Sequence, residues 1–373
     1  HFLGLRTCGG HTAIAQCGRI CTYVYINGMR VSIAGASGYV GGELMRLLEN
    51  HPQFEVIAAA AHSSVDERVD SVHPALAPTS VGSVKMCPAT ADQLKADLVF
   101  MALPHGQSAS IAQELLEMDP GQKIVDLGAD FRLVDPGAWD RYYSGVHAGS
   151  WTYGLPEVGD QRRHISRSTT VANPGCYATA ISLACAPAVA HQIMGHSTIN
   201  VVAASGTSGA GRVPSQALMA SGVMGSISAY KIGGVHQHIP EIEQTLNSLR
   251  PEVSTRISFT PLLAPMPRGI IATCTSAMSE SSTVDPIAIY QEYYEHSTFV
   301  SVLEHGQMPN TGSVSGSNFV QLSVSVDQHS QQLIVIATLD NLGKGAAGQA
   351  IQNANLMCGF AESSGLLHTG VSP

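Results

Sequence analysis

A cysteine stands directly after a Pro-Gly turn in the segment Val-Ala-Asn-Pro-Gly-Cys-Tyr-Ala-Thr-Ala (171–180), and an apolar helical run follows it. A thiol at a helix N-terminus lies near free backbone N–H groups and the positive end of the helix dipole, which lower its pKa and favour the thiolate. This placement makes Cys176 a candidate nucleophile. The alternative role is that of a small buried hydrophobe, which we expect for Cys185 and Cys274 because both lie inside apolar stretches.

Two histidines, His236 and His238, follow a Gly-Gly pair in the segment 230–242. A thiolate nucleophile works with a base close to it in space, and the pKa of imidazole lies near neutrality. The segment therefore supplies candidates for proton exchange with the sulfur. Histidines two residues apart could also bind a metal, but no third ligand cluster accompanies them, so we expect no metal site. A packing or surface role is the other alternative for each ring.

Gly35, Gly38 and Gly41 form a Gly-x-x-Gly-x-x-Gly turn between an expected strand (30–34) and an expected helix that ends at His51-Pro52. Glycines let the backbone approach a pyrophosphate, and the helix N-terminus supplies N–H groups and a positive dipole. The context favours a dinucleotide site over a merely structural tight turn. We assign the whole turn to cofactor binding, through Gly35, Ser37, Gly38, Tyr39, Val40 and Gly41.

The second expected strand, Phe54–Ala61, is followed by His-Ser-Ser rather than by an acidic residue. NAD-specific sites usually place Asp or Glu there to hold the ribose 2′-hydroxyl. The hydroxyls of Ser63 and Ser64 could instead accept a 2′-phosphate, so the sequence favours NADP over NAD. We also expect cofactor contacts from three loops that follow other strands, through Pro104, Ser208, Gly209 and Asn341.

Strands and helices alternate from Arg30 to about Asp130, which predicts an α/β domain with a parallel, doubly wound sheet. The second half is β-rich with few helices between its last four strands, which predicts an α+β domain with a mixed, largely antiparallel sheet. The expected strands are 30–34, 54–61, 96–103 and 123–127, then 199–204, 257–260, 269–275, 319–326 and 333–339. We place the dinucleotide-binding domain at 29–175 with a C-terminal helical stretch at about 343–373, and the catalytic domain at 176–342.

Composition narrows the class of protein. Charged residues make up 13% and hydrophobic residues 44%, which suits a compact enzyme and argues against disorder. The net charge of −9, without clustered Lys and Arg, disfavours nucleic acid as a partner. No apolar run is long enough for a membrane span, and the scattered cysteines favour a reducing cytoplasm. Residues 1–28 do not fit the pattern, and we expect them to be a peripheral leader or extension.

Eight motifs resemble, in order, those of the N-acetyl-gamma-glutamyl-phosphate reductases. The combination of Pro-Gly-Cys-Tyr-x-Thr with His-x-His-x-Pro-Glu is the specific part. Three departures remove no chemical group: Ala178 for a frequent Pro, Gly343 for a common Val, and Cys185 for a usual aliphatic residue. The motifs are GASGYVG (35–41), ALPHG (102–106), DLGADFRL (126–133), YGLPE (153–157), NPGCYAT (173–179), SGTSGAGR (205–212), VHQHIPEI (235–242) and DNLGKGAAGQAIQNANLM (340–357).

The resemblance implies a Rossmann-type NADP-binding domain, a substrate and dimerisation domain, and a homo-oligomer (dimer or tetramer). It implies that NADPH reduces N-acetyl-L-glutamyl 5-phosphate to N-acetyl-L-glutamate 5-semialdehyde and phosphate, in arginine biosynthesis. Cys176 and His238 carry over as the catalytic residues. Arginine is the natural bidentate partner of phosphate and carboxylate, with a structural ion pair as the alternative for each. The expected substrate-binding residues are Arg132, Asn173, Arg212, His236, Glu241 and Arg268.

Three other functions stay open at this point. A sister enzyme could act on aspartyl phosphate or on a carrier-bound aminoadipyl group with the same chemistry. A dinucleotide-binding sensor without catalysis would not need the Cys176 and His238 pair. A metal-binding protein could draw on the 16 histidines.

Overall fold

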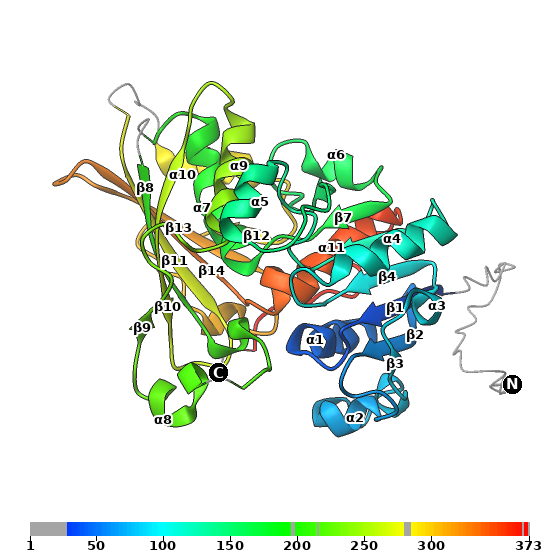
Figure 1. Ribbon diagram of the computed structural model, residues 1–373. Helices are drawn as coiled ribbons and strands as arrows, with labels where there is room; N and C mark the ends of the chain where they lie inside the picture. The colour runs from blue at the N-terminus through cyan, green and yellow to red at the C-terminus, as the bar shows by residue number, and fades with distance from the viewer. Residues whose placement is uncertain (1–27, 195–197, 215, 280–284, 368, 372–373) are drawn as a thin grey trace, which may run out of the picture.

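The computed structural model describes residues 28–194, 198–214, 216–279, 285–367 and 369–371, and nearly all of the expected leader (residues 1–27) lies outside this part. The described chain forms two sheets side by side, each with helices packed against it (Figure 1). No helix in the described part is long and apolar enough to cross a membrane.

The first sheet is parallel throughout, with the order β3-β2-β1-β4-β5-β7-β6. β1 lies between β2 and β4, so the chain direction across the sheet reverses at this point, which is where doubly wound sheets bind ligands. The prediction of a parallel α/β sheet is confirmed. The strands are β1 (Met29–Ala34), β2 (Phe54–Ala61), β3 (Cys87–Pro88), β4 (Leu98–Met101), β5 (Lys123–Asp126), β6 (Thr152–Tyr153) and β7 (Thr170–Ala172).

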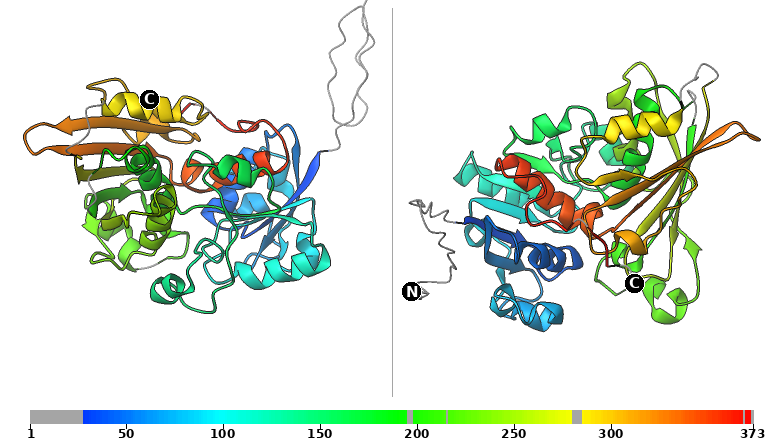
Figure 2. Two further views of the ribbon diagram at one scale, coloured as in Figure 1. Left: turned by 90° about the horizontal axis from the view of Figure 1, so that it is seen from above. Right: turned by 180° about the vertical axis from the view of Figure 1, so that it is seen from behind.

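Both faces of the first sheet are covered. Val31 and Ile33 of β1 pack in one apolar cluster with α1 and α11, and Ala34 packs with α3 and α4 in another. The C-terminal helix thus returns to the first sheet (Figure 2). The helices of this half are α1 (Tyr39–Leu48), α2 (Val69–Val72), α3 (Ala91–Leu94), α4 (Ser108–Met118), α5 (Pro136–Tyr142), α6 (Gln161–Ile165) and α11 (Gly348–Met357).

The second sheet is mixed, with the order β12-β13-β14-β11-β8-β10-β9. Two pairs are parallel, β8 with β10 and β12 with β13, and the other pairs are antiparallel, as expected. The bounds are β8 (Thr198–Ser205), β9 (Ser228–Ala229), β10 (Arg256–Leu263), β11 (Ile270–Ala277), β12 (Val300–Val302), β13 (Val320–Asp327) and β14 (Gln332–Leu339).

One face of the second sheet packs against α7 (Cys176–Ala190), α9 (Ile239–Leu249) and α10 (Pro286–Tyr294). α7 is apolar on all sides and almost wholly buried, which makes it the central helix of the molecule. The short helix α8 (Ala220–Val223) lies on the segment before β9. The sequence reasoning overlooked α10, although its start carries a helix signal: Asp285 caps the helix and Pro286 opens it.

Candidate active site

The glycine turn has the backbone that the sequence predicts. Gly35 has φ of 85°, and a Cβ there would stand 2.2 Å from the carbonyl oxygen of Ala102 on the neighbouring loop. A Cβ on Gly41 would stand 2.3 Å from the Gly35 oxygen. α1 begins at Tyr39 without a side-chain cap, so no capping side chain uses its first N–H groups. The turn is therefore built for close approach of an anionic group to the backbone.

A cavity of about 930 Å³ lies over this turn, at the reversal point of the first sheet. Its far walls are the loop after β4 and the second Gly-rich loop, so both halves of the chain contribute. No acidic residue stands directly after β2, although Glu67 lines the wall further on. The volume and the backbone cradle fit a dinucleotide. Of the expected cofactor residues, those that line it are Gly35, Ser37, Gly38, Tyr39, Val40, Ser63, Ser64, Pro104 and Ser208.

Three expected cofactor residues do not line this cavity: Gly41, Gly209 and Asn341. Gly41 lies beneath the turn and serves its packing. Asn341 is buried, accepts a hydrogen bond from the Gly269 N–H (2.8 Å) and donates to the Ser208 hydroxyl (2.9 Å). Asn341 thus holds the second Gly-rich loop in place, and both ends of its side-chain amide already have hydrogen-bond partners within the protein.

Cys176 is the first residue of α7, as expected, and three elements converge on it. His238 immediately precedes α9, and its Nε2 lies 2.4 Å from the point that a Cβ on Gly175 would occupy. On another side, a Cβ on Gly345 would stand 2.8 Å from the Cys176 Cβ. Because Gly175 and Gly345 have no side chain, the His238 imidazole can lie against the turn before Cys176, and the backbone at Gly345 can lie against Cys176 itself.

The turn behind Cys176 is a single π-helical turn, η6 (Gly343–Ala347). Its Lys344 is fully buried and donates to Glu157 and Gln352, each at 2.6 Å. The Ala346 carbonyl accepts from Asn173 (3.2 Å), three residues before the cysteine. π-turns are frequent at functional sites, and this one fixes the wall beside the sulfur.

The electrostatics of the pair differ from the sequence expectation. Burial raises the pKa of the Cys176 thiol to about 11, although the Tyr177 N–H at the helix start and Arg132 both act to lower it. The predicted net lowering is therefore wrong for the protein without ligands, because loss of water outweighs the helix terminus. Burial, with the nearby charges of His236 and Arg132, also holds the pKa of His238 well below its usual range. These pKa shifts favour the neutral thiol of Cys176 and the neutral imidazole of His238 near pH 7.

Three of the expected substrate-binding residues instead position the Cys176 turn. The Glu241 carboxylate accepts from the Gly175 N–H (2.7 Å) and from the Tyr153 hydroxyl (2.7 Å). Arg132 donates to Glu241 (3.3 Å) and to the Asn173 carbonyl (2.8 Å), and all are buried. The third guanidinium contact of Arg132 is the carbonyl of Leu127, which lines the cofactor cavity. This network joins the cavity wall to the nucleophile.

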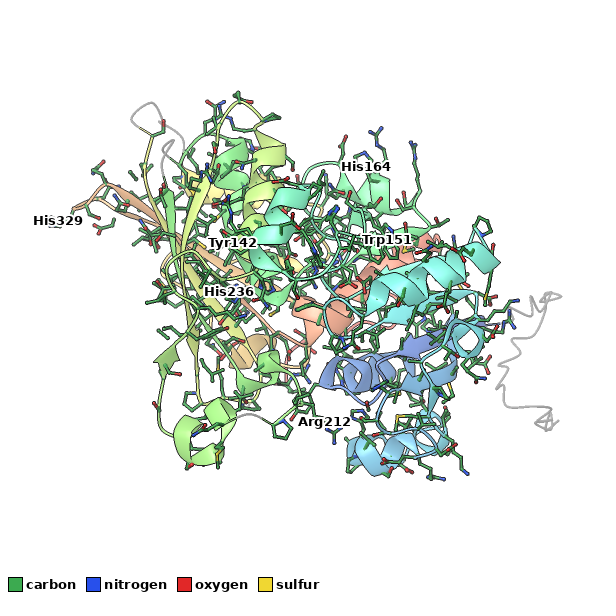
Figure 3. The ribbon with its side chains drawn as sticks, viewed as in Figure 1. Tyr142, Trp151, His164, Arg212, His236 and His329 are labelled. Atoms are coloured by element: carbon green, nitrogen blue, oxygen red, sulfur yellow. The ribbon has the colours of Figure 1, made fainter. Side chains whose placement is uncertain are left out.

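The other two arginines make their contacts outside the Cys176 turn. Arg212 is exposed and donates to the carbonyls of Ser37 (3.1 Å) and Val72 (3.0 Å), so it belongs to the cofactor cavity. Arg268 forms structural ion pairs, which were the alternative to substrate binding. It contacts Glu43 of α1 (2.7 Å) and Asp340 (2.9 Å). Figure 3 shows Arg212 where the green segment meets the blue α1–α2 region, apart from His236.

The second histidine, His236, packs edge-on against Tyr177 and His238, and its Nδ1 accepts from the His238 N–H (3.2 Å). Burial lowers its pKa to about 4. It therefore orients the loop that carries His238. In the described residues no group of three or more His, Cys, Asp or Glu could hold a metal ion.

Sequence reasoning missed two residues near the histidines, His105 and Lys231. His105 lines the cofactor cavity and its ring lies 5.7 Å from that of Tyr143. Lys231 donates to the Gln237 side chain (2.5 Å), between the two site histidines. Both stand in motifs or segments that were singled out, ALPHG and 230–242, but only the histidine pair was given a role there.

Comparison with protein-family models gives the class. Residues 30–168 match the semialdehyde dehydrogenase NAD binding domain, and residues 176–341 match the semialdehyde dehydrogenase dimerisation domain. Solved structures share the fold at low identity. Aspartate semialdehyde dehydrogenase II from Vibrio cholerae, complexed with ASA, has a TM-score of 0.68 at 16% identity over 89% of this chain and 98% of that one. The enzyme from Candida albicans with NADP has 0.63 at 14%, over 89% and 99%.

Curated relatives give the particular family. The chain is 51% identical to N-acetyl-gamma-glutamyl-phosphate reductase from Salinispora tropica and 50% identical to that from Acidothermus cellulolyticus, in each case over 93% of this chain and the whole of the relative. The chain belongs to the N-acetyl-gamma-glutamyl-phosphate reductase family of semialdehyde dehydrogenases. The resemblance seen in the motifs is confirmed.

Proposed function

We propose that this chain reduces N-acetyl-L-glutamyl 5-phosphate with NADPH, giving N-acetyl-L-glutamate 5-semialdehyde, NADP+ and phosphate, as a step of arginine biosynthesis. The observation that supports it is the close approach of His238 to Gly175, directly before Cys176 at the start of α7, in a turn that Arg132 joins to the wall of a dinucleotide-sized cavity. The names of the relatives favour this substrate over aspartyl phosphate or a carrier-bound group.

The cysteine supplies the covalent step. His238, neutral at rest, accepts the proton of the Cys176 thiol, and the sulfur attacks the acyl carbon. The bond from that carbon to the phosphate oxygen breaks, phosphate leaves, and a thioester remains. The residues of the glycine turn would hold NADPH, which would supply the hydride for reduction of the thioester carbonyl. Breaking of the C–S bond would then release the semialdehyde and return Cys176 as the thiolate. The Cys176 N–H is the donor that we propose for the developing oxyanion.

Nε2 is the nitrogen of His238 that faces the cysteine turn. Its Nδ1 is buried and has no hydrogen-bond partner among the described residues, so nothing there stabilises a charged ring. This environment suits a group that takes up a proton briefly and returns it. The Glu241 carboxylate keeps the Gly175 turn in place while the sulfur changes from thiol to thioester.

The cofactor preference rests on the end of β2 and on Arg212. Ser63 and Ser64 line the cavity where an acidic residue would select the ribose of NAD. Arg212 reaches the same cavity from the second half of the chain and places a positive charge between the glycine turn and α2. Both features favour NADP, and we assign the phosphate groups of the cofactor to this end of the cavity.

The reverse reaction tests the proposal. Wild-type protein should form NADPH from NADP+, phosphate and N-acetylglutamate semialdehyde, and much less with aspartate semialdehyde. Cys176→Ala should abolish this turnover, whereas Cys185→Ala, on the same helix but buried in the core, should keep it. Phosphate-dependent turnover in Cys176→Ala would contradict the covalent mechanism, and a preference for aspartate semialdehyde would contradict the substrate.

We also infer a homodimer formed through the outer face of the second sheet. That face carries Val202, which is 49% exposed at the middle of the sheet on β8, and the segment before β9 adds Met219, Met224 and Ile227. An apolar surface of this kind is typical of an interface. Sedimentation should show a dimer or tetramer that Val202→Glu weakens.

All cysteines in the described part are free, which fits the reducing cytoplasm that we expect.

A further inference from the structure

The proposed substrate carries a phosphate and a carboxylate, and the three arginines expected to bind them are engaged elsewhere. Arg132 is buried with all its contacts made within the protein. Arg268 is paired with Glu43 and Asp340. Arg212 lies at the glycine turn. A phosphate leaving from the carbon that Cys176 attacks needs a cation near the histidines, so that cation must come from another residue.

Lys231 is the exposed cation of the loop that leads to those histidines. Its Nζ donates to the side chain of Gln237, which stands between His236 and His238 in the sequence. The backbone carbonyl of Gln237 accepts from the Tyr143 hydroxyl (3.4 Å), and the Tyr143 ring lies edge-on to His105. The ammonium group therefore lies over the site, between the loop after β4 and the start of α9.

The effect of the Lys231 ammonium group on nearby histidines agrees with a position near the site. Its positive charge contributes to lowering the pKa of His105, of His236 and of His238, after burial as the main cause in each case. These rings come from two separate segments of the chain. The ammonium group of Lys231 therefore lies within electrostatic range of both segments.

The backbone at Lys231 is in the left-handed region, with φ of 44°. A side chain with a Cβ is disfavoured there, and glycine would adopt the conformation more easily. Gly233 and Gly234 follow with positive φ as well, so the loop folds sharply back on itself. Strained residues of this kind are found at functional sites, and here the turn directs a charged side chain toward Gln237 and the histidines.

We propose that Lys231 binds the phosphate group of the acyl phosphate, leaving Gln237 for the substrate when it enters. This inference rests on the proposed function. The phosphate is bonded to the carbon that the sulfur attacks, so it must lie beside the Cys176 and His238 pair, whereas the carboxylate lies further along the substrate. Exchange of a neutral amide for a phosphate replaces a hydrogen bond in which only the donor is charged by a stronger one in which both partners are charged.

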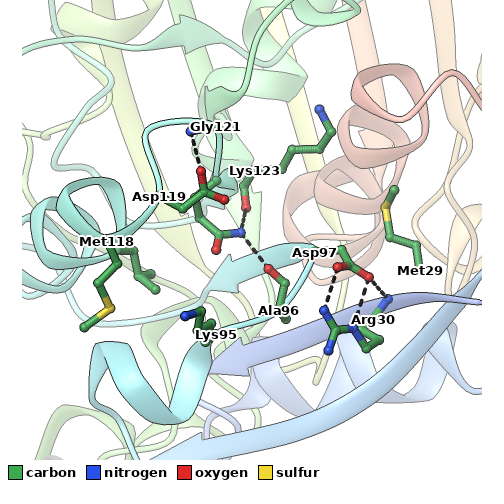
Figure 4. Close-up of a pocket in the computed structure, with 11 residues that line it drawn as sticks. Met29, Arg30, Lys95, Ala96, Asp97, Met118, Asp119, Gly121 and Lys123 are labelled. Atoms are coloured by element: carbon green, nitrogen blue, oxygen red, sulfur yellow. Dashed lines mark hydrogen bonds and ion pairs between the residues drawn. The ribbon is translucent and has the colours of Figure 1, made fainter.

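The test is the reverse reaction with Lys231→Met, Lys231→Arg and a matched control. Loss of a hydrogen bond to a charged group corresponds to about 10–100-fold in binding. We expect Lys231→Met to raise the KM for inorganic phosphate by about that factor, with little change in the KM for NADP+ or semialdehyde. Lys231→Arg should restore part of the affinity. The control is Lys95→Met, another exposed lysine, which lines a cavity at the amino ends of β1, β4 and β5 (Figure 4).

A second measurement does not depend on turnover. Inorganic phosphate should slow the alkylation of Cys176 in wild type and in Lys95→Met, and should protect Lys231→Met only at much higher concentration. An unchanged phosphate KM and unchanged protection in Lys231→Met would overturn the proposal, as would a rise confined to the semialdehyde KM. Wild-type protein that fails to turn over semialdehyde with NADP+ and phosphate would instead contradict the proposed function. Melting temperatures of the variants exclude unfolding as the cause.

Discussion

The cofactor turn and the nucleophile junction are assembled in different ways. The turn is one continuous segment, Gly35–Gly41, between β1 and α1, and its geometry follows from local glycine chemistry. The junction brings together Cys176, His238 and Gly345, from segments far apart in the sequence. Local physics suffices for the first, while the second depends on tertiary packing. Substitutions should therefore separate the two, affecting chemistry at the junction without affecting dinucleotide binding.

The largest effect that we expect is that of His238→Ala. General acid–base catalysis is typically worth about 10²–10⁴-fold in rate, so kcat/KM in the reverse direction should fall by that factor while NADPH binding, followed by fluorescence titration, stays the same. His164→Ala, an exposed histidine on α6, is the matched control. Full activity of His238→Ala would show that the imidazole takes no part in catalysis.

Gly175→Ala tests the closeness of the junction itself. The new methyl group would stand 2.4 Å from the His238 Nε2, so the imidazole or the cysteine turn must shift. Misplacement by about 1 Å can cost about 10²-fold in rate, and we expect a loss of that order in kcat. Gly222→Ala, where a Cβ meets nothing within 4 Å, should be neutral. Equal activity of the two variants would show that catalysis does not require the close approach of His238 to Gly175.

Arg212→Ala should act on the other region. Removal of the guanidinium beside the glycine turn should raise the KM for NADPH by about tenfold, the scale of one hydrogen bond to a charged group, and reduce the preference over NADH. The KM for semialdehyde should not change. Arg256→Ala, on an exposed arginine of β10, serves as the control. A change in the semialdehyde KM alone would show that Arg212 binds the substrate and not the cofactor.

The smallest effect concerns pH. Because the pKa of Cys176 is raised to about 11, the thiolate fraction and the alkylation rate of the unliganded protein should rise about tenfold per pH unit between pH 7 and 9. A folded-state pKa above the ordinary value also means that its contribution to stability is present below pH 9 and is lost as pH rises toward 11. A rate that levels off near pH 7 would show that the helix terminus outweighs burial.

The same contrast explains what the sequence could predict. The glycine turn, Cys176 at the start of a helix and the nearby histidine pair are local patterns, and the structure has them as expected. The partners of Arg132 and Arg268 lie on elements distant in sequence, so local spacing could not tell a ligand from an ion pair. The pKa of Cys176 was mispredicted for the same reason, since burial is a property of the whole fold.

The Arg268 ion pairs have a mechanical consequence. Glu43 on α1 and Asp340 at the end of β14 are buried, and Arg268 joins them across the boundary between the two halves. Separation of the halves would break the contact of Arg268 with Glu43, while Glu43 would keep Arg46 and Asp340 would keep Arg268 as partners. This one contact therefore ties α1, beside the glycine turn, to the strand end that leads into the turn behind Cys176. Adjustment to a ligand is then expected from exposed segments such as 231–235, which belong to neither sheet.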